Sequence, residues 1–144
     1  MLALGRGPRY APLVLAALFA LASSGCGKLD RDAVQTEIQS ISSAAAEGAL
    51  VAREVERGRT LRSFAVIRTA ELHKVAMNAA ESLQETRAED HLEGAATRGS
   101  ELGAHVRDLL ERLHEKPTDR ALAGNVRRQL DQLSSQASDL ADKL

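Results

Sequence analysis

The sequence predicts an all-α fold, an antiparallel up-down-up-down four-helix bundle over residues 32–144. Alanine, leucine, glutamate, arginine and glutamine dominate this range, and all of them favour helices. Apolar and small side chains recur at alternating intervals of four and three residues, the spacing of helices that pack at a shallow angle. Phe64 is the single aromatic residue after residue 25, whereas a β-sandwich or barrel would need many aromatic and β-branched residues.

The first helix is expected over 32–57. Asp30 or Asp32 can cap its N-terminus, because a carboxylate accepts hydrogen bonds from the unpaired N–H groups of the first turn. Gly58 follows the helix and suits a C-terminal stop. The side chains predicted to face the core are Val34, Ile38, Ile41, Ala45, Gly48, Ala52 and Val55.

The second helix is expected to begin at a cap on Thr60 or Ser63, and the short connection makes it an antiparallel neighbour of the first helix. A second apolar group lies roughly opposite its main apolar face, so this helix is expected to be covered on two sides. The main face is Leu61, Phe64, Ala65, Leu72, Val75, Ala76, Ala79 and Leu83; the second group is Val66, Ala70, Met77 and Ala80.

Arg68 falls in the middle of the main face of the second helix. One interpretation is a long side chain whose stem packs while its charged head reaches water. The other is a partly buried pair with Glu47 that fixes the register of the helical hairpin. The same hairpin predicts that Phe64 lies over the small residues Gly48 and Ala52.

The third helix is expected to start at Thr86-x-x-Glu89, which has the pattern of a capping box. No proline or glycine lies in 84–91, so a single long bent helix through this interval is the alternative. The predicted core positions are Leu92, Ala95, Gly99, Leu102, Val106, Leu109 and Leu113.

Pro117 marks the clearest break between helices and suits the first turn of the fourth helix. The positions predicted to face the core from there to the end of the chain are Ala123, Val126, Leu130, Leu133, Ala137, Leu140 and Leu144. Many core positions in the four stretches are alanine or glycine, which bury little area. We therefore expect either a bundle of low stability or a face that is covered by a partner chain.

The first 25 residues have the three parts of a secretory signal peptide. Arg6 and Arg9 form a short basic region, an apolar run over 11–22 follows, and small residues end the segment. The apolar run is shorter than the roughly 20 residues that a membrane-spanning helix needs. We therefore expect this segment to target the chain for export and then to be removed.

The small residues that precede Gly25 and Cys26 resemble the lipobox of bacterial lipoproteins, a likeness that covers residues 1–28. The resemblance implies cleavage between Gly25 and Cys26, a diacylglyceryl thioether on the Cys26 sulfur, and an acylated new N-terminus. It divides the chain into a signal peptide (1–25), a lipidated tether (26–31) and a helical bundle (32–144). Cleavage after Ala22 is the alternative, and it would leave the chain's one cysteine as a free thiol.

Charge and motifs exclude several classes of function. Without Arg6 and Arg9, the 19 basic side chains fall to 17, against 20 acidic ones. The sequence contains no block of basic residues of the kind that indicates nucleic-acid binding. Glu111-x-x-His114 and the pair Glu101 and His105 have metal-ligand spacings, but they lie off the leucine positions, so we predict no metal site and no cofactor. The serines, Ser40, Ser42, Ser43, Ser134 and Ser135, are expected on polar helix faces, which predicts no enzyme.

Three functional classes fit these patterns. The preferred one is a lipid-anchored envelope protein, outside the cytoplasm in the periplasm or on the cell surface, whose bundle is structural or binds a protein partner or a second copy. The second is a small-ligand or stress-sensing bundle, which a pocket lined by Phe64, Met77 and Arg68 would favour. The third is an accessory regulator that docks its helices on a membrane protein.

Overall fold

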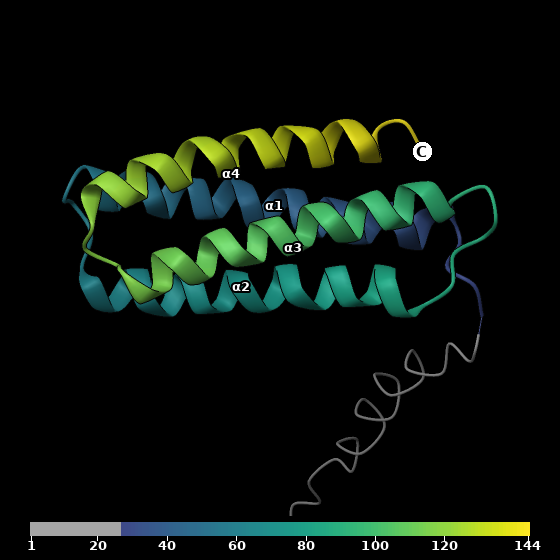
Figure 1. The fold of residues 1–144 in the computed structure, drawn as a ribbon, viewed down its shortest axis with the longest axis horizontal. Helices are drawn as coiled ribbons and strands as arrows, with labels where there is room; N and C mark the ends of the chain where they lie inside the picture. The colour runs from purple at the N-terminus through teal and green to yellow at the C-terminus, as the bar shows by residue number, and fades with distance from the viewer. Residues whose placement is uncertain (1–26) are drawn as a thin grey trace, which may run out of the picture.

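The computed structural model describes residues 27–144, and this part of the chain is a bundle of four helices (Figure 1). The helices are α1 (Arg31–Glu56), α2 (Arg62–Glu85), α3 (Glu93–Glu115) and α4 (Arg120–Ala141). The predicted all-α bundle is therefore confirmed. The segment predicted to be a signal peptide, the expected cleavage site and Cys26 lie outside the described residues.

Neighbouring helices run in opposite directions. Ser42 and Ser134 exchange hydrogen bonds between α1 and α4, each hydroxyl donating at 3.0 Å to the other residue's carbonyl. The Gln35 side chain, near the start of α1, donates to the carbonyl of Ala141 at the end of α4 at 3.2 Å. These contacts hold α1 against α4, so Ser42 and Ser134 lie between helices and not on the solvated faces that the sequence predicted.

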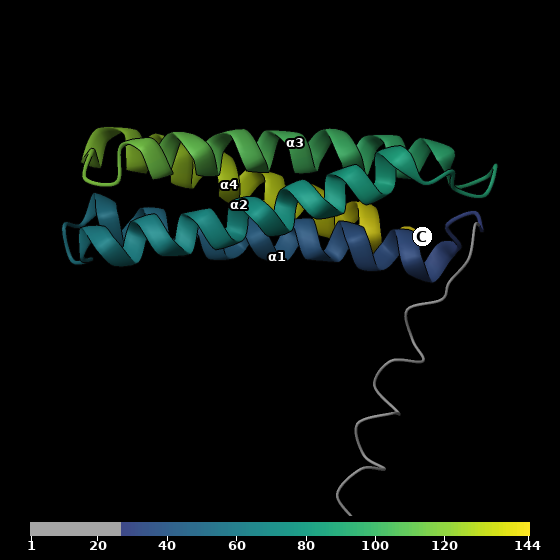
Figure 2. The same ribbon diagram turned by 90° about the horizontal axis from the view of Figure 1, so that it is seen from below.

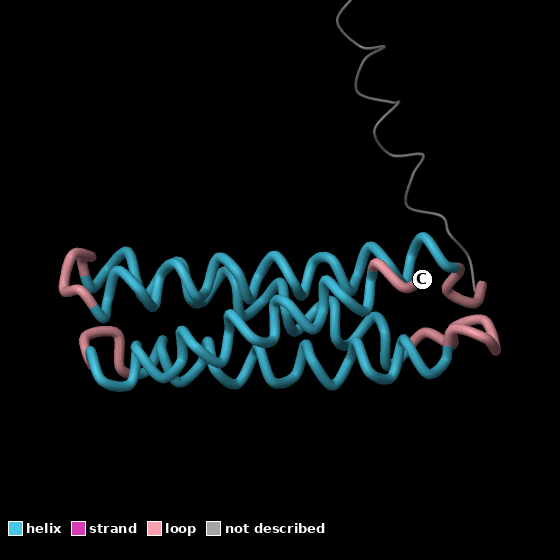
Figure 3. Tube along the Cα trace, turned by 90° about the horizontal axis from the view of Figure 1, so that it is seen from above, coloured by secondary structure: helices cyan, strands magenta, loops and turns pink. Residues whose placement is uncertain are grey.

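The loops gather at the two ends of the bundle (Figure 3). The start of α1, the α2–α3 loop and the C-terminus share one end, and the α1–α2 and α3–α4 turns share the other (Figure 1). Figure 2 shows that α2 lies beside α1 at the turn end and crosses towards α3 at the opposite end. We call the end with the start of α1, the α2–α3 loop and the C-terminus the base. The end with the α1–α2 and α3–α4 turns is the distal end.

α1 contributes more residues to the core than any other helix, and all of its predicted core positions are buried. Asp30 caps α1 by accepting a hydrogen bond from the Ala33 N–H at 2.9 Å, and Gly58 ends it with a φ of 65°, as the sequence predicted. Glycines let the other helices approach closely: a Cβ on Gly103 would lie 2.9 Å from the side chains of Ala80 and Ile41.

The orientation of α2 differs from the prediction. Leu61, Phe64 and Val75, predicted to face the core, are exposed, while Thr69 is buried. Ala80, from the second apolar group, is buried as expected and packs against Gly103 of α3. Arg68 lies at the edge of the core, where its charge keeps contact with water.

The prediction that Phe64 lies over Gly48 and Ala52 is wrong. Leu110 and Leu130 cover Gly48. Phe64 instead borders a shallow hollow on the outside of the α1–α2 hairpin, together with Leu50 and Val51.

Three helix boundaries are corrected as well. Leu61 is the N-cap of α2, in place of Thr60 or Ser63. Thr86 ends α2 and does not start α3, so the capping box and the bent-helix alternative are both wrong. Pro117 lies in the turn before α4, whose cap is Asp119, with its carboxylate accepting from the Leu122 N–H at 2.9 Å.

Candidate functional site

Residues Lys28 and Leu29 are fixed to the α2–α3 loop at the base of the bundle. The Leu29 N–H donates to the Arg87 carbonyl at 2.8 Å, and the Glu89 N–H donates to the Leu29 carbonyl at 3.1 Å. Lys28 Nζ donates to Asp90 Oδ1 at 2.6 Å. We call these three contacts the tether clamp.

The charges of the clamp reinforce its hydrogen bonds. The hydrogen bond from Lys28, and then its positive charge, lower the pKa of the Asp90 carboxyl below its ordinary value of 3.8. The two side chains are largely exposed, so the backbone bonds of Leu29 supply the geometry and the ion pair adds to it.

The clamp begins at Lys28, two residues after Cys26, which the sequence predicts to carry the lipid. Gly27 alone separates Lys28 from Cys26. A group attached to the Cys26 sulfur is therefore joined to the base of the bundle through a single glycine.

The clamp also explains why the capping box failed. The backbone of the α2–α3 loop bonds to Leu29, more than fifty residues earlier, and α3 starts only after this contact. Local propensity at Thr86 and Glu89 gives no sign of such a distant partner.

A stripe of α2 side chains faces outwards beside α1. Its members, Leu61, Phe64, Arg68, Glu71 and Val75, are spaced by three and four residues in alternation. Leu61 is 76% exposed and Phe64 54%, and Ile67 and Leu50 beside them are 60% and 52% exposed. We call the five residues the outer stripe.

Arg68 occupies the centre of the outer stripe. It forms ion pairs with Glu47 of α1 and with Glu71, the latter at 2.8 Å. The hydrogen bonds that Arg68 donates to Glu71 and then to Glu47 raise the pKa of its guanidinium, which keeps its charge. The Arg68 and Glu47 side chains are 39% and 47% exposed, so the pair lies at the surface rather than in the core.

The Arg68–Glu47 pair divides the groove between α1 and α2 into two hollows. The distal hollow, about 240 Å³, is lined by Leu50, Val51 and Phe64 with Glu47, Glu54 and Arg68 at its rim. The other, about 350 Å³, is lined mainly by polar residues of α1 and by Glu71, Leu72 and Val75. Met77, expected beside Phe64 and Arg68 in a ligand pocket, lines neither hollow.

His114 faces α2 and is partly buried, which corrects the prediction that it lies on the outer side of its helix. Its Nδ1 lies 3.1 Å from the Val66 carbonyl and 3.3 Å from the Thr69 hydroxyl. The Thr69 hydroxyl itself donates to the Ala65 carbonyl at 2.7 Å. No local pattern predicts this contact, because Thr69 and His114 are 45 residues apart.

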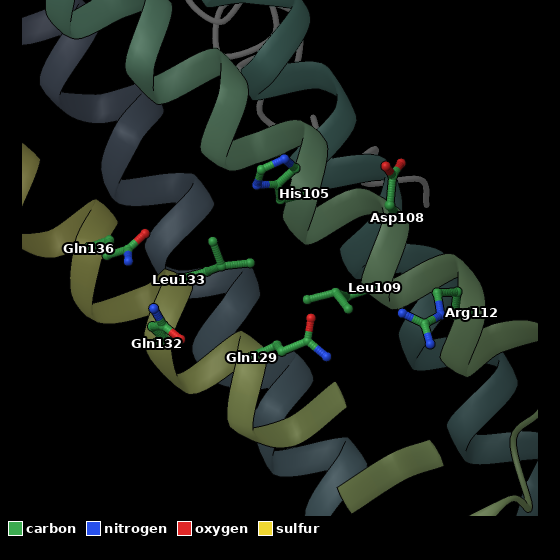
Figure 4. A pocket seen from close by; sticks show the side chains of 8 residues that line it. All are labelled: His105, Asp108, Leu109, Arg112, Gln129, Gln132, Leu133 and Gln136. Atoms are coloured by element: carbon green, nitrogen blue, oxygen red, sulfur yellow. The ribbon is translucent and has the colours of Figure 1, made fainter. Parts of the chain in front are cut away.

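A further hollow, about 400 Å³, lies between α3 and α4 (Figure 4). Leu109 and Leu133 point towards each other across it, and the remaining lining is polar: His105, Asp108, Arg112, Gln129, Gln132 and Gln136. His105 lines this hollow and Glu101, which shares a metal-ligand spacing with it, does not. Within residues 27–144, no three side chains of His, Cys, Asp or Glu are grouped as metal ligands.

None of the four described helices combines the length and the apolar character that crossing a membrane requires. Comparison with protein-family models, with curated proteins and with solved structures finds no match to this chain.

Proposed function

We propose that the protein is a lipid-anchored component of a bacterial cell envelope, held at a membrane through Cys26, with its bundle outside the cytoplasm as a structural or protein-interaction module. The bundle has no catalytic role in this proposal. The anchor fixes where the molecule is, and the outer surfaces of the helices determine what it contacts.

One observation supports the proposal above the rest. The chain is fixed to the base of the bundle at Lys28 and Leu29, directly after the single cysteine. A lipid on Cys26 would therefore hold the base of the bundle near the membrane, while the outer stripe extends along α2 from the distal end.

The energetics of the anchor agree with this arrangement. Each buried methylene of an acyl chain contributes about 0.8 kcal/mol, and two chains are sufficient for stable attachment. The bundle then needs no membrane affinity of its own, which is consistent with its mixed charge.

Replacement of Cys26 tests the proposal in the native host. Cys26→Ser should move the protein from the membrane fraction to the soluble fraction, and it should abolish labelling by a fatty-acid precursor. Ser24→Ala, which keeps the thiol, is the matched control and should stay in the membrane fraction. If Cys26→Ser leaves both fractionation and labelling unchanged, the proposal is wrong and cleavage after Ala22 is favoured.

A further inference from the structure

We propose that the distal end of the bundle binds an acidic surface of a different protein, through cations around the two distal turns and through the exposed side chains of Leu61 and Phe64. Such a contact gives the interaction module of the proposed function a site and a class of partner, and it therefore rests on that function. The distribution of charge between the two ends of the bundle is the main evidence for it.

The bundle is basic at the distal end and acidic at the base. The distal half, residues 44–73 and 105–130, carries 11 basic and 8 acidic side chains. The base half, residues 27–43, 74–104 and 131–144, carries 6 basic and 12 acidic ones. The net charges of the two halves are therefore about +3 and −6, although the body as a whole is close to balanced.

The ends of the four described helices follow the same division. α1 and α3 begin at the base with an acid in the first turn, Asp32 and Glu93, and they end at the distal end with basic residues in the last turn. Both placements are favourable with the helix dipole. α2 and α4 begin at the distal end without an acid in the first turn, and their first residues are Arg62 and Arg120. A positive charge is unfavourable at a helix start, so helix stability gives no reason for these two arginines.

Six exposed cations lie around the two turns of the distal end. We call them the distal cations: Arg57, Arg59, Arg62, Arg112, Lys116 and Arg120. Arg57 and Arg59 share Glu54, at 3.8 and 3.1 Å, and the other four form no ion pair within residues 27–144. The Arg120 side chain lies against Gly58, so the two turns adjoin each other. The distal end therefore presents positive charge that the described part of the chain leaves without a carboxylate partner.

The chemistry of this end favours a protein partner over a lipid surface. Five of the six distal cations are arginine, whose planar guanidinium can bond both oxygens of a carboxylate. Leu61 and Phe64, which flank Arg62 in the sequence, are 76% and 54% exposed. Arginine together with aromatic side chains is typical of the centre of protein–protein interfaces. Glu111 and Glu115 lie among the cations of α3, whereas an anionic lipid surface favours an uninterrupted basic cluster.

The proposed anchor leaves the distal end free. The tether clamp holds the base near the membrane, and α1 alone extends for about 39 Å, at 1.5 Å per residue. Charges are screened over roughly 8 Å at physiological ionic strength, so the distal cations of an upright bundle lie beyond the field of the anchoring membrane. A second copy carries its acids mainly in the base half, which its own anchor would hold near the membrane, so it fits this end less well than a different protein.

Site-specific photocrosslinking in the native host tests the contact. Benzoylphenylalanine is placed in the full-length chain at Ser63, an exposed position next to Arg62, or at Thr97, an exposed control position in the base half. The probe at position 63 should crosslink to one other protein, in a segment with an excess of Asp and Glu, and the probe at position 97 should not give this product. No product at position 63, a product with a second copy or with lipid alone, or a crosslinked segment without excess acid would overturn the proposal.

Charge reversal at the two helix starts separates binding from folding. Arg62→Glu combined with Arg120→Glu should reduce the crosslink from position 63 by at least about tenfold, because acids then face the acidic partner. The thermal midpoint should stay the same or rise, since glutamate is favourable in the first turn of a helix. Arg98→Glu combined with Lys143→Glu makes the same change of net charge in the base half and should crosslink like the wild type.

An undiminished crosslink in the distal variant would overturn the proposal, and so would a lower thermal midpoint, which would assign the two arginines to folding. Fatty-acid labelling of the same samples measures lipidation. Loss of the contact and loss of the anchor are therefore distinguishable.

Discussion

Thr69 is the one buried polar side chain in residues 27–144, and its hydroxyl links α2 to His114 of α3. Sequence periodicity assigned neither residue to the core, because threonine and histidine score as polar at any position. For Arg68 the apolar pattern left two interpretations open, a head that reaches water and a partly buried pair with Glu47. In the structure Arg68 pairs with Glu47 while both side chains stay partly exposed.

Replacement of Thr69 by valine tests the contact between the Thr69 hydroxyl and His114 Nδ1. Valine keeps the shape and removes the hydroxyl that lies next to His114 Nδ1, so Thr69→Val should lower the free energy of unfolding by about 0.5–1.5 kcal/mol. Urea denaturation followed by circular dichroism measures this. An unchanged midpoint would show that neither the contact with His114 nor the bond to the Ala65 carbonyl contributes to stability.

Arg68→Ala should leave the urea midpoint of the monomer nearly unchanged, because exposed ion pairs contribute little to stability. A large loss of monomer stability would instead indicate that the Arg68–Glu47 pair supports the hairpin itself.

At the scale of single helices, α1 was predicted almost residue by residue, because every one of its core positions is apolar or small and nothing competes with them. The end of α2 and the start of α3 were not predicted correctly. The tether clamp and the alanine–glycine contact between these helices are made by residues far apart in the sequence. The number of glycines in α3 does not indicate which of them pack against a neighbouring helix.

Gly103 and Gly94 of α3 form a matched pair that tests the close packing of α2 and α3. A Cβ on Gly103 would lie 2.9 Å from Ala80 and Ile41 and 3.3 Å from the Ala76 carbonyl, whereas Gly94 has open space around it. Gly103→Ala should destabilise the protein by about 1–3 kcal/mol, and Gly94→Ala should stabilise it by up to about 1 kcal/mol. Equal effects in thermal unfolding would contradict the packing described above.

The tether clamp should depend on pH in a defined direction. The lowered pKa of Asp90 means that the ionised carboxylate is favoured in the folded clamp. Its contribution is therefore complete above the ordinary value of 3.8 and is lost as the pH falls through the lowered pKa. Asp90→Asn at neutral pH should mimic this loss and speed hydrogen exchange at the Leu29 and Glu89 amides, while Asp108→Asn should not.

For the whole molecule, composition and spacing were enough to predict four helices, but they could not predict which face of α2 would remain exposed. That choice depends on how closely α2 can approach α3, which is set by residues on both helices. The thin alanine core and the exposed outer stripe together fit the expectation that a partner chain covers part of the bundle.

The proposed function depends most on the lipid at Cys26. The intact mass of the protein purified from its own host tests directly whether this lipid is present. We predict the mass of residues 26–144 plus a diacylglyceryl group, with or without an acyl chain on the new N-terminus. A mass equal to unmodified residues 23–144 would contradict the proposed anchor, and with it the proposed location and orientation of the bundle.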